Sequence, residues 1–185
     1  SFLYIQMELC QYSLAEWLDR NRCSTTRSLL RMQLWIRQIA SALAYIHFEN
    51  IIHRDLKPAN ILFADENTLK LCDLGISTVR KTDEGESVDA RTCVGTAMYM
   101  SPEQKEMVPV YSSKIDIFAL GLILCELYEW KPVTELNLMF DNYRSGKHSS
   151  HIKDAATAEF VKMLTHREPA ARPTCEEMLC HSYLS

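Results

Sequence analysis

The chain has 185 residues, 47% of them hydrophobic and 24% charged, which is enough for one soluble domain with its own core. A formal net charge of −4 excludes a protein that binds nucleic acid by its overall charge, so we expect no direct nucleic-acid partner. Seven cysteines without a C-x-x-C pair argue against a zinc site or a disulfide framework and favour a reducing cytosol. The longest apolar run, 117–125, is too short to span a membrane, and no membrane contact is expected.

The first part of the chain predicts one strand and two helices. Residues 2–9 have the apolar character of a buried strand. A helix starts at Ser13, because Glu16 three residues later forms a capping-box pattern with it. The next helix runs from about Ser28 to Phe48, where apolar residues recur at steps of three and four along one face.

The remainder of the chain predicts short strands, a polar loop and then further helices. Residues 51–75 alternate short apolar runs with polar clusters, and 76–100 form a loop with modification sites. The later helices are expected at about 115–129 with Ser112 or Ser113 as the cap, at 134–145, at 154–165, and from Thr174 with Glu177 as its capping-box partner. The expected fold class is therefore mainly α with a small β element.

Three short motifs occur in order along the middle of the chain. Residues 53–60 read H-R-D-L-K-P-A-N, residues 73–75 read D-L-G, and residues 101–103 read S-P-E. They resemble the motifs H-R-D-L-x-x-x-N, D-F-G and A-P-E of the eukaryotic-type serine/threonine protein kinases. The resemblance covers residues 1–185. It implies the hinge and the C-terminal lobe of the protein kinase-like fold, with an activation segment at 73–103.

The resemblance assigns chemical roles to the charged and amide residues of the first two motifs. Phosphoryl transfer from ATP depends mainly on positioning and on neutralising charge. Asp55 would accept the proton of the substrate hydroxyl, and Lys57 would hold the γ-phosphate. Asn60 and Asp73 supply the oxygen ligands that Mg²⁺ prefers. Gly75 would permit the backbone turn that follows the metal ligand.

Four residues near the start of the chain and in the middle are expected to bind the adenine of ATP. By the same resemblance, Met7 is the gatekeeper side chain, and the segment from Glu8 to Cys10 is the hinge whose backbone bonds the adenine edge. Leu62 would pack beneath the adenine ring. These residues complete the expected ATP-binding set.

Regulation by phosphorylation is expected from Arg54 and the activation segment. A phosphate on that segment would pair with Arg54, and Thr92 is our first candidate for the phosphorylated residue. Thr96 would bond within the catalytic loop or help to position the substrate. The alternative is that the hydroxyl residues of this segment are ordinary solvated loop residues.

Five further residues are expected to support the site without taking part in the chemistry. His53 would pack and hydrogen-bond, and Leu74 would form a hydrophobic plug in place of the usual phenylalanine. Asp116 resembles the helix aspartate that tethers the backbone of the catalytic loop. Arg172 resembles the arginine that pairs with the glutamate of A-P-E, here Glu103, and loss of either partner would leave a buried charge.

Longer stretches resemble one group within the kinases. Residues 3–10 (L-Y-I-Q-M-E-L-C) and 94–104 (V-G-T-A-M-Y-M-S-P-E-Q) are similar to the kinases of the alpha subunit of translation initiation factor 2. Residues 111–121 look most like the endoplasmic-reticulum stress member, whereas 13–18 look like the haem-regulated member. The resemblance implies that this alpha subunit is the substrate. It also implies a cytoplasmic location, or the cytosolic face of the endoplasmic reticulum in the full protein, and it leaves a homodimer open.

By the same resemblance, the large protein substrate would dock on the helix expected at 134–145. Leu138, Met139, Phe140 and Tyr143 would form an apolar stripe there if they face outward. The alternative for each of them is ordinary core packing.

No glycine-rich loop, strand lysine or partner glutamate of the kinase small lobe occurs in the sequence. The chain has five glycines, none of them in a run that could cradle phosphates. We therefore expect a fragment that lacks the N-terminal lobe and that binds ATP weakly by itself.

Two interpretations follow from this gap. The chain is the large lobe of an active kinase, as intact Asp55, Asn60 and Asp73 favour. Alternatively it is a catalytically incompetent module for substrate docking or dimerisation, as the missing lobe favours. A metal-dependent hydrolase would need an activated water and more convergent ligands. The sequence upstream of residue 1 would separate the first two interpretations.

Overall fold

The computed structural model describes residues 4, 6–22, 28–74, 78–79, 97–108, 112–148 and 152–185. The helices are α1 (Leu14–Arg20), α2 (Leu29–Phe48), α3 (Pro102–Lys105), α4 (Lys114–Tyr128), α5 (Val133–Arg144), α6 (Ala155–Leu164) and α7 (Cys175–Leu179). The strands are β1 (Tyr12–Ser13), β2 (Ile51–Ile52), β3 (Ile61–Phe63), β4 (Leu69–Leu71) and β5 (Thr78–Val79). Short 3-10 turns occur at Pro58–Asn60, Pro169–Ala171 and Ser182–Leu184. The expected fold class, mainly α with a small β element, is confirmed.

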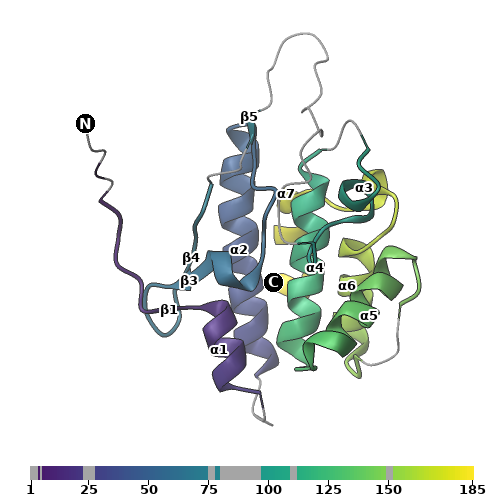
Figure 1. Cartoon of the computed structure of the whole chain (residues 1–185), viewed down its shortest axis with the longest axis horizontal. Helices are drawn as coiled ribbons and strands as arrows, with labels where there is room; N and C mark the ends of the chain where they lie inside the picture. Colours follow the sequence, from purple (N-terminus) through teal and green to yellow (C-terminus); the bar gives the residue numbers. More distant parts are fainter. Residues whose placement is uncertain are drawn as a thin grey trace.

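Helices α2 and α4 lie side by side and form the centre of the molecule (Figure 1). Helix α4 is apolar on all sides and is buried along nearly its whole length, as expected for a central helix. Helix α2 buries one face and leaves Leu30 and Phe48 exposed on the other. Helix α6 packs so closely on α4 that a Cβ atom at Gly121 would lie only 2.6 Å from Thr165 Cγ2. Among the described helices, none is both long enough and apolar enough to cross a membrane.

The helix starts follow the local signals in the sequence. Ser13 caps α1 and Thr174 caps α7, each in a capping box with the residue three positions later. Ser28 caps α2 through a hydrogen bond from Arg31 N to its hydroxyl. Ser113 occupies the N-cap position of α4, but its side chain makes no capping hydrogen bond.

Two small antiparallel sheets connect the helices. The first has the order β1-β3-β4, with Tyr12 opposite Phe63 and Leu62 opposite Lys70. The second pairs β2 with β5. Strand β3 begins directly after the 3-10 turn that ends at Asn60, so the sheet fixes the end of the predicted catalytic loop.

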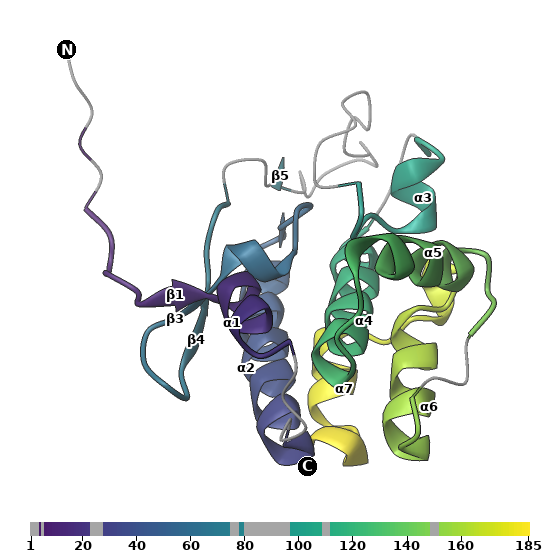
Figure 2. The same cartoon turned by 60° about the horizontal axis from the view of Figure 1, so that its bottom comes forward.

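The expected strand at 2–9 is wrong within the described residues. Residues 6–10 belong to no strand, and Tyr4, Met7 and Leu9 are 80 to 93% exposed. Strand pairing begins at Tyr12, the first residue of β1. Just before it, Gln11 N donates to Phe63 O at 2.8 Å. The chain before β1 leads away from the body of the molecule (Figure 2). An apolar run becomes a buried strand only where a neighbouring strand and a covering layer are present.

Candidate active site

The predicted catalytic loop brings three of its polar side chains together. Lys57 Nζ donates to Asp55 Oδ2 at 2.6 Å. Asn60 Nδ2 donates to the Asp55 carbonyl at 2.9 Å and lies 3.4 Å from Asp55 Oδ2. Asn60 is almost fully buried, and Asp55 and Lys57 are partly buried. A carboxylate, a cation and an amide therefore share one small site.

His53 joins this loop to the second motif. Its Nδ1 accepts from Asp55 N at 3.3 Å, and its Nε2 lies 3.0 Å from the carbonyl oxygen of Cys72. Cys72 N also donates to Asn60 O at 3.0 Å. These contacts fix Cys72, the residue before Asp73, to Asn60 and His53; Asp73 itself is exposed, and its backbone φ is +64°. Such a φ is uncommon outside glycine, although aspartate and asparagine adopt it more readily than most residues.

Asp116, on α4, accepts hydrogen bonds from the backbone at the start of the catalytic loop. Its side chain is 1% exposed, and it accepts from His53 N at 2.9 Å and from Arg54 N at 3.0 Å. Arg54 has φ +71°, a strained conformation that these two hydrogen bonds help to maintain. The structure therefore brings Asp116 to the backbone that the sequence assigned to it.

Two residues that contact this loop or its partner Asp116 were not predicted from the sequence. His47, in the last turn of α2, places Nε2 2.8 Å from Asp116 Oδ2. Gln104 donates from Nε2 to the Arg54 carbonyl at 3.2 Å. The available signals were weak: His47 is a polar residue one turn after the buried Leu43, and Gln104 completes a capping box with Ser101.

The third motif is fixed by a buried ion pair. Arg172 donates to both carboxylate oxygens of Glu103, at 2.6 and 2.9 Å, and the Arg172 side chain is fully buried. The same guanidinium donates to the carbonyls of His166 and Lys114 and lies 4.8 Å from the Phe118 ring centre. A bidentate pair with its remaining donors satisfied can be buried at acceptable cost.

Helix α5 holds the residues just before the third motif. Arg144 is almost fully buried, and its Nε donates to Met100 O at 2.7 Å. It also donates to the carbonyl of Met98 and to Asp141 Oδ1. The segment that precedes α3 is thereby attached to α5.

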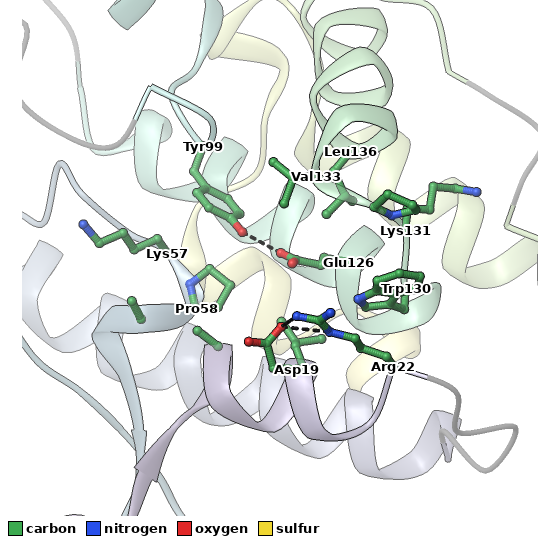
Figure 3. A pocket seen from close by; sticks show the side chains of 14 residues that line it. Asp19, Arg22, Lys57, Pro58, Tyr99, Glu126, Trp130, Lys131, Val133 and Leu136 are labelled. Carbon is green, nitrogen blue, oxygen red and sulfur yellow. Dashed lines mark hydrogen bonds and ion pairs between the residues drawn. The ribbon is translucent and has the colours of Figure 1, made fainter.

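A cavity of about 670 Å³ lies beside the catalytic loop (Figure 3). Lys57 and Pro58 line one side, and α1 and the end of α4 line the other. Tyr99 Oη donates to Glu126 Oε2 at 2.6 Å inside it. Burial and the neighbouring Glu126 carboxylate raise the pKa of Tyr99, so the hydroxyl keeps its proton and remains a donor. The cavity is large enough for several residues of an extended chain.

The rest of this cavity wall carries paired charges. Arg22 Nη2 lies 2.5 Å from Asp19 Oδ1, and the Arg22 guanidinium lies 5.6 Å from the Trp130 ring centre. Lys131 Nζ donates to Glu129 at 3.2 Å. Positive and negative groups are therefore mixed around the opening.

The residues expected to bind adenine differ widely in exposure within the described part of the chain. Met7 is 80% exposed, so the side chain of the expected gatekeeper is not packed into the described part of the chain. Glu8 accepts from Lys70 Nζ at 2.5 Å, and Lys70 is the sheet partner of Leu62. Cys10 and Leu62 are half-buried. Among the described residues, no helix or strand covers the Met7 side chain.

Several other expectations are corrected or lie outside the described residues. Leu74 is 46% exposed, so it does not form the expected buried hydrophobic plug. Gly75, Thr92 and Thr96 are outside the described residues.

Of the two alternatives for the apolar residues of α5, core packing holds for three and an outward position for one. Met139, Phe140 and Tyr143 are buried, and they pack into the main core. Leu138 alone of the four is exposed, at 66%, on the opposite face of α5. The helical period placed the helix correctly, but three of the four apolar residues face inward.

Comparison with known proteins agrees with this geometry. The family model for the protein kinase domain matches residues 1–184. Eukaryotic translation initiation factor 2-alpha kinase pek-1 of Caenorhabditis elegans is 37% identical, over 100% of this chain and 18% of that protein. The interferon-induced, double-stranded RNA-activated protein kinase of Rattus norvegicus is 38% identical, over 96% of this chain and 34% of that protein.

A third relative, eukaryotic translation initiation factor 2-alpha kinase 3 of Rattus norvegicus, is 35% identical over 98% of this chain and 16% of that protein. The chain thus spans about a third or less of the length of these relatives. The ordered motifs, the shared site and these matches lead to one conclusion: the chain belongs to the protein kinase family, and kinases of translation initiation factor 2-alpha are among its relatives.

Proposed function

We propose that this chain is the large lobe of a serine/threonine kinase that transfers the γ-phosphoryl group of ATP to the alpha subunit of translation initiation factor 2. The observation that carries the proposal is the convergence of Asp55, Asn60 and the Asp73 segment through His53 and Cys72. The names of the relatives supply the substrate. Such a kinase would reduce translation under stress, in the cytoplasm or at the cytosolic face of the endoplasmic reticulum.

The donor set fits Mg²⁺ carried by ATP. The Asn60 amide nitrogen is used by the Asp55 carbonyl, which leaves the amide oxygen Oδ1 as a ligand. Asp73, which follows the Cys72 that bonds the Asn60 backbone, would add an exposed carboxylate. Within the described residues no group of three His, Cys, Asp or Glu side chains could hold a metal ion, so the nucleotide would have to supply further oxygens. When bound, Mg²⁺ would neutralise charge on the phosphates.

Asp55 and Lys57 would act on the two reacting partners. Asp55 Oδ2 would accept the proton of the substrate hydroxyl and direct its oxygen. Lys57, which lies 2.6 Å from that oxygen, would turn to the γ-phosphate and reduce repulsion during transfer. The cavity beside Lys57 and Pro58 would receive the segment that carries the phosphorylated hydroxyl.

Docking of the protein substrate would use the exposed face of α5. Leu138 lies on this face, with Thr134 exposed one turn before it. Arg144 of the same helix bonds the Met100 carbonyl, so a substrate held on α5 would be held in a fixed relation to the cavity. Replacing Leu138 by Asp should raise KM for the protein substrate and leave KM for a short peptide unchanged. Equal effects on both substrates would contradict docking at this face.

Regulation would act through Arg54. We propose that phosphate on Thr92 pairs with the Arg54 guanidinium and that Thr96 bonds within the catalytic loop. Thr92→Ala should lower activity in the complete protein, and unchanged activity would exclude Thr92 as the regulatory site.

The decisive test is phosphorylation of the initiation factor by the complete protein. Asp55→Asn should reduce the rate by about 100-fold or more, since the variant cannot accept a proton. Glu66→Gln is the matched control, because Glu66 is an exposed carboxylate in the neighbouring turn, and it should have no effect. An unchanged rate in Asp55→Asn would overturn the chemistry. Transfer to other proteins but not to this factor would overturn only the substrate.

Two observations favour a second function for the chain by itself. Met7 and Leu9 are exposed, and no phosphate-cradling glycine run occurs in the sequence. The chain would then be a non-catalytic docking module. Titration of the 185-residue chain with the initiation factor and a phosphorylation assay of the complete protein test this, since a docking module would bind the factor while the complete protein would transfer no phosphoryl group to it.

A further inference from the structure

A hydrogen-bonded series of three side chains from three helices lies next to the catalytic loop; Cys175 and Asp116 are buried and His47 is partly buried. Cys175 is the first residue of α7, His47 is in the last turn of α2, and Asp116 is in the first turn of α4. Cys175 Sγ lies 3.5 Å from His47 Nδ1, and His47 Nε2 lies 2.8 Å from Asp116 Oδ2. Asp116 in turn accepts the backbone N–H groups of His53 and Arg54.

A thiol, an imidazole and a carboxylate in line are the groups of a nucleophilic triad, but this thiol cannot act as one. Cys175 is 1% exposed, so no substrate can reach it. Burial and the negative charge of Asp116 raise the pKa of the thiol. Cys175 therefore stays protonated, and its S–H group is available as a hydrogen-bond donor.

The order of donors and acceptors along this series of three side chains is fixed by the two outer groups, Cys175 and Asp116. An ionised Asp116 can only accept, so His47 must carry a proton on Nε2 to bond it. In the neutral imidazole the other nitrogen, Nδ1, is then an acceptor. The only group that the described contacts place on Nδ1 is the thiol of Cys175. A donor at this position favours the tautomer with the proton on Nε2.

We propose that Cys175 is a positioning residue for the catalytic loop. Its S–H group donates to His47 Nδ1 and thereby fixes the tautomer of His47 that carries its proton on Nε2. This tautomer donates to Asp116 and so strengthens the hydrogen bonds that Asp116 accepts from the backbone N–H groups of His53 and Arg54. The proposal rests on the proposed function only for its effect on turnover, because the tautomer and the loop contacts belong to this chain alone. Helix α7, near the end of the chain, thereby contributes to the geometry of the loop that holds Asp55.

The first experiment reads the tautomer of His47 directly. Multiple-bond ¹H–¹⁵N NMR spectra of the 185-residue chain should show the Nε2–H tautomer in the wild type. Cys175→Ser keeps a donor and should retain this signature. Cys175→Val has no donor and should shift His47 toward a mixture of forms. A wild-type spectrum with protons on both nitrogens, or one unchanged in Cys175→Val, would overturn the proposal.

The second experiment follows the two backbone N–H groups that bond Asp116. Hydrogen exchange at His53 and Arg54 should be about fivefold faster in Cys175→Val, the change given by loss of one average hydrogen bond. Cys175→Ser should restore slow exchange. Cys125→Val is the matched control, because Cys125 is also buried but lies at the other end of α4. Equal acceleration in the Cys125 variant would show a packing effect and reject the proposal.

Turnover of the complete protein provides the last readout. In Cys175→Val, kcat should fall about fivefold with KM for ATP unchanged, and Cys175→Ser should recover it. A loss that serine does not restore would contradict the positioning role. A protein without any phosphoryl transfer would defeat the proposed function, while the NMR result would still decide the role of Cys175.

Discussion

The catalytic loop at 53–60 and the segment at 6–10 reach the same small sheet from opposite ends of β3, but they are held very differently. The loop is fixed by α4 through Asp116, by α3 through Gln104 and by a turn that ends in buried Asn60. The segment at 6–10 is mostly exposed. The phosphate end of the proposed site is therefore built by contacts within this chain, and the adenine end is not.

The largest expected effect comes from removing Asp116. Asp116→Ala leaves the N–H groups of His53 and Arg54 without their buried acceptor, and we expect a loss of about 3 kcal/mol in the free energy of unfolding. Met7→Ala, in the exposed segment, should change it by less than about 0.5 kcal/mol. Urea denaturation of both variants gives the two values.

Asp116→Asn is the control for this comparison. It keeps an oxygen acceptor but loses the charge, so its loss should lie between those of the other two variants. If the Met7 and Asp116 variants lost equal stability, the contrast between the two ends of the site would be wrong.

A smaller effect is expected at the link between α3 and the catalytic loop. Gln104→Leu removes the donor to the Arg54 carbonyl and the acceptor for Ser101 N, so we expect a loss of about 1.5 kcal/mol. Gln104→Glu keeps the acceptor but not the donor, and should separate the two contributions. Thermal denaturation measures the stability, and faster hydrogen exchange at Ser101 in the leucine variant alone would verify the assignment.

The helices of this fold could be predicted because their signals are local. The pairs Ser13–Glu16 and Thr174–Glu177 lie within one turn, and each caps a helix in the structure. Strand β1 could not be placed in the same way, because its pairing depends on Phe63, far along the chain. Residues 2–9 have the composition of a strand, but composition does not reveal whether a neighbouring strand exists.

The candidate site shows the same difference between residues with a local sequence signal and residues whose contacts are distant along the chain. Asp55 and Asn60 were found because a short motif carries them, and motif spacing is visible in one sequence. His47 and Cys175 were not found, because their contacts join helices more than 60 residues apart. For the same reason the period of α5 predicted a helix but could not show that Phe140 faces inward.

The smallest expected effect concerns the contact between Glu8 and Lys70. The hydrogen bond and charge of Glu8 raise the pKa of Lys70 above its ordinary value of 10.5. A raised pKa in the folded state means that this contact contributes fully below pH 10.5 and that its contribution is lost as the pH rises through the folded value.

Glu8→Gln should return the pKa of Lys70 toward 10.5, measured by NMR titration of its side chain, and should leave the melting temperature within experimental scatter. Glu66→Gln, another exposed carboxylate, should leave the Lys70 titration unchanged. A clear drop in melting temperature for Glu8→Gln would mean that the segment at 6–10 is held as firmly as the catalytic loop. The adenine end of the site would then be preformed in this chain, as its phosphate end is.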